Sequence, residues 1–99
     1  MVRHIVSWNF KPELTPEERQ AAREVLVSRL TALKELVPVA LEVQVSCPPL
    51  DSSSCDLVLY SEVAQASDLP LYQNPPEHQA VLPLIRQYLC DRRCCDIEG

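Results

Sequence analysis

The sequence predicts one α+β domain over residues 1–99, with four antiparallel strands and two main helices in the order β-α-β-β-α-β. Three observations predict it. Segments at the start and in the middle of the chain alternate between apolar and polar residues with the period of a half-buried strand. Two other segments repeat apolar residues at helical spacing. The two middle strands are joined by too few residues for a parallel crossover.

The first strand is expected over residues 2–10, where every second side chain faces one apolar side. A long helix follows over about residues 16–36. Thr15 and Glu18 mark its start, because their spacing allows a capping box in which each side chain accepts a hydrogen bond from the other's backbone N–H. Pro38 marks its end, because proline cannot continue a helix.

Two further strands are expected over residues 40–47 and 55–63, which alternate in the same way. Residues 48–54 join them as an antiparallel hairpin, because a parallel crossover needs about a dozen residues or more. Together with the first strand, these two strands are expected to form a sheet with the helices packed on one face. The residues on that face are Val2, His4, Val6, Trp8, Leu41, Val43, Val45, Leu57 and Leu59.

The last third of the chain supplies the second main helix, over about residues 76–89, after a short helical turn that opens near Asp68. Pro83 should kink this helix or split it into two turns. The last strand is expected over about residues 91–97. The resulting order is that of a ferredoxin-like split βαβ unit, with both helices on one face of an antiparallel sheet. The other face, which no helix of the same chain can reach, carries Ile5, Val58 and Tyr60.

The composition excludes several classes of function. A net charge of −5 argues against sequence-independent nucleic-acid binding, which needs a basic face. Gly99 is the only glycine, so no dinucleotide-binding turn, Walker A loop or EF-hand loop is present. The uncharged stretches fall far short of the about 20 residues of a membrane span, and no secretory signal is recognised. We therefore expect a cytoplasmic protein with neither a nucleic-acid nor a membrane partner.

Five cysteines occur in the chain: Cys47, Cys55, Cys90, Cys94 and Cys95. An odd number without a signal peptide favours reduced thiols over a disulfide framework. The Cys90, Cys94 and Cys95 group, together with Cys47 and Cys55, could in principle supply thiolates to zinc, but the spacing matches no zinc finger or ribbon. We expect small, buried or half-buried apolar side chains, and neither a metal nor a cofactor.

Four segments, over residues 1–8, 14–19, 56–62 and 72–81, resemble the stress-responsive α/β-barrel family, whose members are dimeric α/β barrels. The resemblance covers essentially the whole chain. It implies a homodimer whose two sheets face each other and a role in the stress response. Pro75 stands where the family's pattern has the first of two histidines, and the family's glycines near the first helix and second strand are missing.

The same resemblance extends to a plant polyketide cyclase of this fold and implies a catalytic site of Tyr72, His78 and His4. A histidine can exchange a proton near neutral pH, and a tyrosine hydroxyl can donate to a developing oxyanion. Alternatively, His4 is a core residue bonded to a backbone carbonyl, and His78 caps a helix. The apolar wall of a pocket is expected from Val6, Trp8, Leu59 and Val81, unless Trp8 fills the space itself.

Three functions remain open at this point. The first is a homodimer, joined through the face of Ile5, Val58 and Tyr60, that binds an apolar or aromatic carbonyl compound without established turnover. The second is a cyclase, isomerase or lyase that uses His78 and Tyr72 as an acid/base pair. The third is a haem- or oxygen-handling barrel, which lacks an obvious second set of axial or distal residues.

Overall fold

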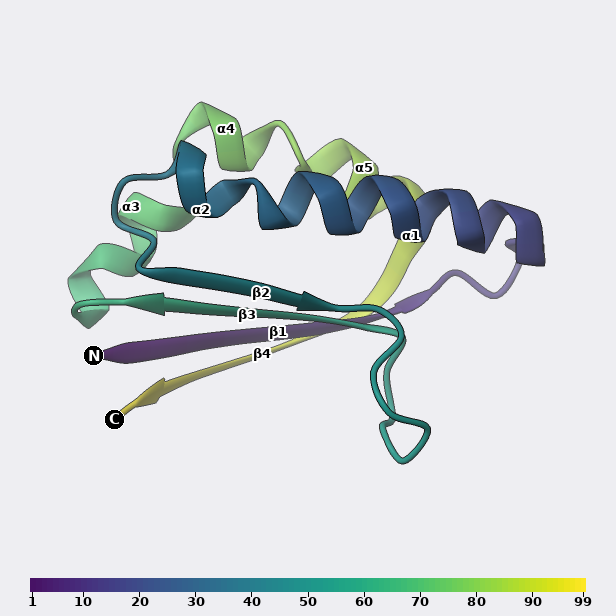
Figure 1. The fold of residues 1–99 in the computed structure, drawn as a ribbon, viewed down its shortest axis with the longest axis horizontal. Helices are drawn as coiled ribbons and strands as arrows, with labels where there is room; N and C mark the ends of the chain where they lie inside the picture. The colour runs from purple at the N-terminus through teal and green to yellow at the C-terminus, as the bar shows by residue number, and fades with distance from the viewer.

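A four-stranded antiparallel sheet with all helices on one face is the architecture of the computed structural model, which describes all 99 residues (Figure 1). The strand order is β2-β3-β1-β4, so that the first strand of the chain lies inside the sheet. This confirms the predicted ferredoxin-like α+β fold. The strands are β1 (Val2–Phe10), β2 (Glu42–Ser46), β3 (Leu57–Val63) and β4 (Leu89–Glu98).

The helices form a second layer over the sheet (Figure 1): α1 (Pro16–Thr31), α2 (Leu33–Leu36), η1 (Ala66–Asp68), α3 (Leu69–Gln73), α4 (Pro76–Gln79) and α5 (Leu82–Tyr88). The predicted capping box starts α1, since the Thr15 hydroxyl accepts from the Glu18 N–H at 3.1 Å and the Glu18 carboxylate accepts from the Thr15 N–H at 2.9 Å. The expected helix over 76–89 is split into α4 and α5, with Pro83 in the first turn of α5. None of the helices is long and apolar enough to cross a membrane.

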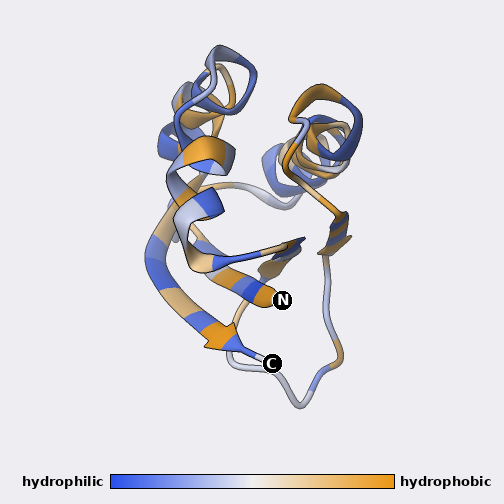
Figure 2. Ribbon diagram, turned by 90° about the vertical axis from the view of Figure 1, so that its left-hand side faces the viewer, coloured by the Kyte–Doolittle hydropathy of each residue, from blue (hydrophilic) through white to orange (hydrophobic).

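The hydrophobic core lies between the two layers. From α1 it takes Ala22, Leu26 and Leu30, and from β3 it takes Leu57, Leu59 and Val63. Figure 2 shows the facing strands and helices striped with hydrophobic residues, as half-buried elements are.

Leu41 is the one residue wrongly placed on the face that carries the helices. It is 52% exposed, whereas the preceding Ala40 is buried. Strand β2 begins only at Glu42. Leu41 lies at a bend before the strand and does not follow its alternation, and Ala40 packs in the core instead.

Strand β4 forms an outer edge of the sheet and pairs only with β1. The register shifts near its start, where Asp91 has a φ of 56°. Beyond that point Asp96 pairs with His4, and Cys95 pairs with Ile5. Because residues paired across antiparallel strands share a face, Asp96 lies on the side of the helices, and Cys95 lies on the open side.

Candidate functional site

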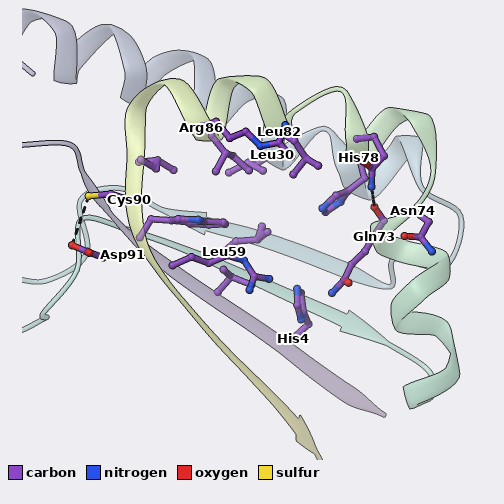
Figure 3. A pocket seen from close by; sticks show the side chains of 16 residues that line it. His4, Leu30, Leu59, Gln73, Asn74, His78, Leu82, Arg86, Cys90 and Asp91 are labelled. Carbon is purple, nitrogen blue, oxygen red and sulfur yellow. Dashed lines mark hydrogen bonds between the residues drawn. The ribbon is translucent and has the colours of Figure 1, made fainter.

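A pocket of about 470 Å³ opens between the sheet and the helix layer (Figure 3). A volume of this size suits a small organic ligand. Its apolar lining comes from β1, β3, the start of β4, α1 and α5: Val6, Trp8, Leu59, Leu89, Leu30, Leu82 and Ile85. Polar residues lie at both ends, with Gln73 and Asn74 at one and Cys90 and Asp91 at the other (Figure 3). Half of the sixteen lining residues are hydrophobic, and the polar half includes the two arginines Arg86 and Arg92. The cavity therefore combines an apolar wall with several polar and charged groups, as ligand sites often do.

Both histidines of the chain line this pocket. His4 projects from β1 in the sheet, and His78 comes from α4 in the helix layer above it (Figure 3). Strand alternation places His4 on the side of the helices, as the sequence predicts. The two imidazoles therefore face one cavity from its two opposite layers.

His4 is held by a partner that the sequence analysis did not include. Its Nδ1 lies 2.5 Å from Oδ1 of Asp96, which the register of β1 and β4 places beside it. An ionised carboxylate only accepts hydrogen bonds, so Nδ1 of His4 is the donor in this pair. The alternative of a core histidine bonded to a backbone carbonyl does not describe His4, because its partner is this carboxylate.

His78 has no hydrogen-bond partner for its buried Nδ1. Burial lowers the pKa of His78 below its ordinary value of 6.5, and the nearby positive groups of His4 and Arg92 lower the pKa further. The ring is therefore neutral at pH 7. It caps no helix, since no hydrogen bond joins the side chain to a backbone group. An uncharged imidazole with an unsatisfied buried nitrogen can accept a proton from a ligand or donate one to it.

Tyr72 lies between the two histidines but behind the wall of the pocket. Its ring meets that of His78 edge to face at 4.9 Å, and that of His4 at 5.9 Å. The side chain is fully buried, and its hydroxyl forms a 2.8 Å hydrogen bond with Oγ of Ser61. Burial raises the pKa of Tyr72, although the bond to Ser61 opposes that rise. The three predicted rings thus come together, with the Tyr72 hydroxyl already paired inside the core.

The predicted apolar wall lies partly where it was expected. Val6, Trp8 and Leu59 line the pocket, and Trp8 leaves the cavity open. Val81 does not line it and is packed in the core instead. The expectation for Val81 assumed one continuous helix face from His78, but α4 ends at Gln79 and breaks that face.

The cysteines are all free thiols. Cys47, Cys55 and Cys90 are half-buried, whereas Cys94 and Cys95 are exposed, contrary to expectation. The reason is that no helix covers this part of the edge strand β4. Partial burial and the charge of Asp96 raise the pKa of Cys94, so its side chain is a thiol rather than an activated thiolate nucleophile.

Several lining residues were not predicted from the sequence, among them Gln73, Asn74 and Arg92. Two residues that bond to the predicted rings were also missed, Ser61 on Tyr72 and Asp96 on His4. Ser61 gives a weak signal, because it is a polar residue at an inward position of β3. Asp96 gives none, because its place beside His4 depends on the register shift near Asp91.

The model of the stress responsive A/B barrel domain family matches residues 2–98. No curated protein matches the chain. Among solved structures, a dimeric protein of unknown function with a ferredoxin-like fold from Bacteroides fragilis is 24% identical, with a TM-score of 0.91, over 99% of this chain and 95% of that one. A dimeric ferredoxin-like protein from Thermobifida fusca is 21% identical, with a TM-score of 0.81, over 99% and 90% of the two chains. A candidate antibiotic biosynthesis monooxygenase from Nitrosomonas europaea is 13% identical, with a TM-score of 0.76, over 100% and 98%. At these identities the solved structures establish the fold.

Proposed function

The chain belongs to the stress responsive A/B barrel domain family, and from this premise we propose that it is a homodimer whose subunits each bind a small apolar or aromatic carbonyl compound. The binding site in this proposal is the pocket between the sheet and helices α4 and α5. The observation that carries it is the placement of His4 and His78 on opposite sides of one cavity with an apolar wall.

The lining of the pocket supports a ligand with an apolar body and a polar end. Trp8, Leu59 and Ile85 offer flat or branched apolar surface to an aromatic ring. His78 offers a neutral imidazole, whose N–H can donate to a carbonyl oxygen. A carbonyl placed at the histidines would leave the ring of the ligand against the strands.

The homodimer is supported by the open face of the sheet. Ile5, Val58 and Tyr60 are half-buried on the side away from all helices, and the half-exposed Ile97 of β4 extends the same side. A two-fold operator would lay each apolar patch on its own copy and close the assembly. Two structures with the same fold, those from Bacteroides fragilis and Thermobifida fusca, are dimers.

Saturation-transfer NMR with a matched pair of probes tests the binding site. Acetophenone carries the carbonyl group, and ethylbenzene has a similar shape without it. We expect saturation to be transferred from the protein to acetophenone, and less strongly to ethylbenzene. Leu82→Phe should fill the pocket and abolish the transfer, whereas Leu71→Phe changes an exposed leucine outside the lining and should not. Equal transfer in both variants would contradict the assigned site.

Proton transfer next to a carbonyl is the second candidate function, and the state of His78 favours it. A neutral, partly buried imidazole is ready to accept a proton at pH 7. In this reaction His78 would take the proton, and the amide N–H groups of Gln73 or Asn74 in the pocket lining would stabilise the enolate oxygen. Tyr72 would position the His78 ring, since its own hydroxyl is bound to Ser61.

Deuterium exchange separates binding from turnover. The methyl hydrogens of acetophenone should exchange in D₂O faster with the protein than with buffer, and His78→Ala should remove the acceleration while binding is largely kept. Gln87→Ala, on the exposed surface of α5, is the control. If exchange does not exceed the buffer rate, the protein is a binder without this activity.

A further inference from the structure

Three side chains of different donor chemistry converge at the edge of the sheet, beside the pocket. His4 comes from β1, and Cys94 and Asp96 come from β4. Their donor atoms all lie within 4.8 Å of one another. Sγ of Cys94 is 3.8 Å from Nδ1 of His4 and 3.8 Å from Oδ1 of Asp96. We call this set the β1–β4 donor cluster.

The β1–β4 donor cluster has the wrong geometry for a nucleophilic cysteine. A Cys-His-Asp relay needs the thiol on one ring nitrogen and the carboxylate on the other. Here both Cys94 and Asp96 face the same nitrogen, Nδ1 of His4. The three donors thus point to one common centre, which is the arrangement of ligands around a cation.

From this convergence we propose that Nδ1 of His4, Sγ of Cys94 and the carboxylate of Asp96 form a Zn²⁺ site with a fourth position open to solvent. Zinc takes imidazole, thiolate and carboxylate ligands together, and three protein ligands plus water are the usual set of an open site. One thiolate and one carboxylate balance the two charges of the ion. Cys94 is exposed and Asp96 is 39% exposed, so water has access to the fourth position.

The distances require little rearrangement. Tetrahedral zinc with bonds of about 2.0–2.3 Å holds its ligand atoms roughly 3.3–3.6 Å apart. The thiol of Cys94 is a few tenths of an ångström beyond this separation from both partners. Nδ1 and Oδ1, at 2.5 Å, share a hydrogen that the cation would replace, and the half-exposed Asp96 has room to turn.

The strands preorganise this cluster. Residues 94 and 96 are two apart on one strand, so their side chains point to the same face, and Asp96 is the ladder partner of His4. The intervening Cys95 points to the open face. His4 itself is only 2% exposed, which fixes its ring between Tyr72 and the edge strand. A buried imidazole with two donors on a paired strand needs little ordering on binding.

A cation at Nδ1 would also change the pocket. Nδ1 donates to Asp96, so in a neutral ring Nε2 would be an acceptor. With the cation on Nδ1, the ring hydrogen would lie on Nε2, which would become a donor. The site would thus couple cation binding to the hydrogen-bonding character of one wall of the pocket.

The test is metal binding by the reduced, chelator-treated full chain. Co²⁺, which takes the place of Zn²⁺ and absorbs light, should bind at one ion per chain and give a thiolate-to-cobalt charge-transfer band that added Zn²⁺ removes. Cys94→Ser should abolish the band. Asp96→Asn should keep the fold. Each variant should weaken Zn²⁺ binding by more than about 100-fold, because mutating even a residue that only hydrogen-bonds to a metal ligand lowers metal affinity by about 10–100-fold.

Cys95→Ser is the matched control, because it removes the neighbouring thiol on the other face of the same strand. It should keep the band, the stoichiometry and the affinity. The proposal is overturned if the wild-type chain binds no stoichiometric Co²⁺ or Zn²⁺. It is equally overturned if Cys94→Ser, folded by circular dichroism, keeps the band, or if Cys95→Ser loses it. These results do not depend on whether the pocket binds a carbonyl compound.

Discussion

The ring of Tyr72 meets the ring of His78 edge to face, with 4.9 Å between the centroids, while the Tyr72 hydroxyl is hydrogen-bonded to Ser61 in the core. The contact gives Tyr72 a role in holding the His78 ring. The hydroxyl, in contrast, contributes to the stability of the fold. The two parts of this side chain can be separated by substitution.

Tyr72→Phe keeps the ring and removes the hydroxyl. We expect the free energy of unfolding to fall by about 1–3 kcal/mol, because Oγ of Ser61 is left buried without a partner. Acetophenone binding should change little, since Tyr72 does not line the pocket. Urea unfolding and saturation-transfer NMR measure the two effects.

The double variant Tyr72→Phe with Ser61→Ala removes both partners and is the control. It should be more stable than Tyr72→Phe alone, because neither polar group is then left unpaired. Loss of binding in a stable Tyr72→Phe variant would instead show that the hydroxyl contacts the ligand.

The pH dependence of stability should contain a contribution from His78. Burial lowers its pKa in the folded protein below the 6.5 of the unfolded chain. Between these two values the unfolded chain binds a proton that the folded chain does not, so stability falls as the pH drops through this window. His78→Gln should lose this dependence and gain stability relative to the wild type as the pH falls from about 7 to 5.

Chemical unfolding at a series of pH values measures this difference. The comparison of the two proteins at each pH removes the contribution of all other groups. A constant difference between them across the range would contradict the lowered pKa of His78.

The capping box at Thr15 and Glu18 and the alternation in β1 were readable from the sequence because they are local. They depend on spacings of three and two residues, which the chain itself contains. Pro83 likewise predicts the division of the second helix, because proline limits the backbone wherever it stands.

The site was readable only in part, because its remaining contacts are long-range. His4 and His78 could be placed on facing layers, but Asp96 is 92 residues from His4, and its position depends on the register shift near Asp91. The prediction that Val81 lines the pocket was wrong for a similar reason. The exact end of α4 decides which residues share the face of His78, and helix ends are set by tertiary packing as well as by sequence.

The proposed dimer predicts that one charge on the open face separates the subunits. Val58→Glu places a carboxylate within the apolar patch of Ile5, Val58 and Tyr60, and should raise the Kd of the dimer by about 100-fold or more. Leu71→Glu, on a 57% exposed leucine of α3, should leave the dimer intact. Sedimentation velocity measures both. A wild-type chain that is monomeric at micromolar concentration would contradict the dimer.

The histidine ring signals in the NMR spectrum test the central claim, ligand binding between His4 and His78, most directly. The chain has only these two histidines, and both line the pocket, so a variant at His78 assigns the two signals. On titration with acetophenone, both signals should shift and saturate together, and neither should shift in Leu82→Phe, whose pocket is filled. Signals that stay unchanged in the wild type, or that shift equally in Leu82→Phe, would contradict binding between the two imidazoles.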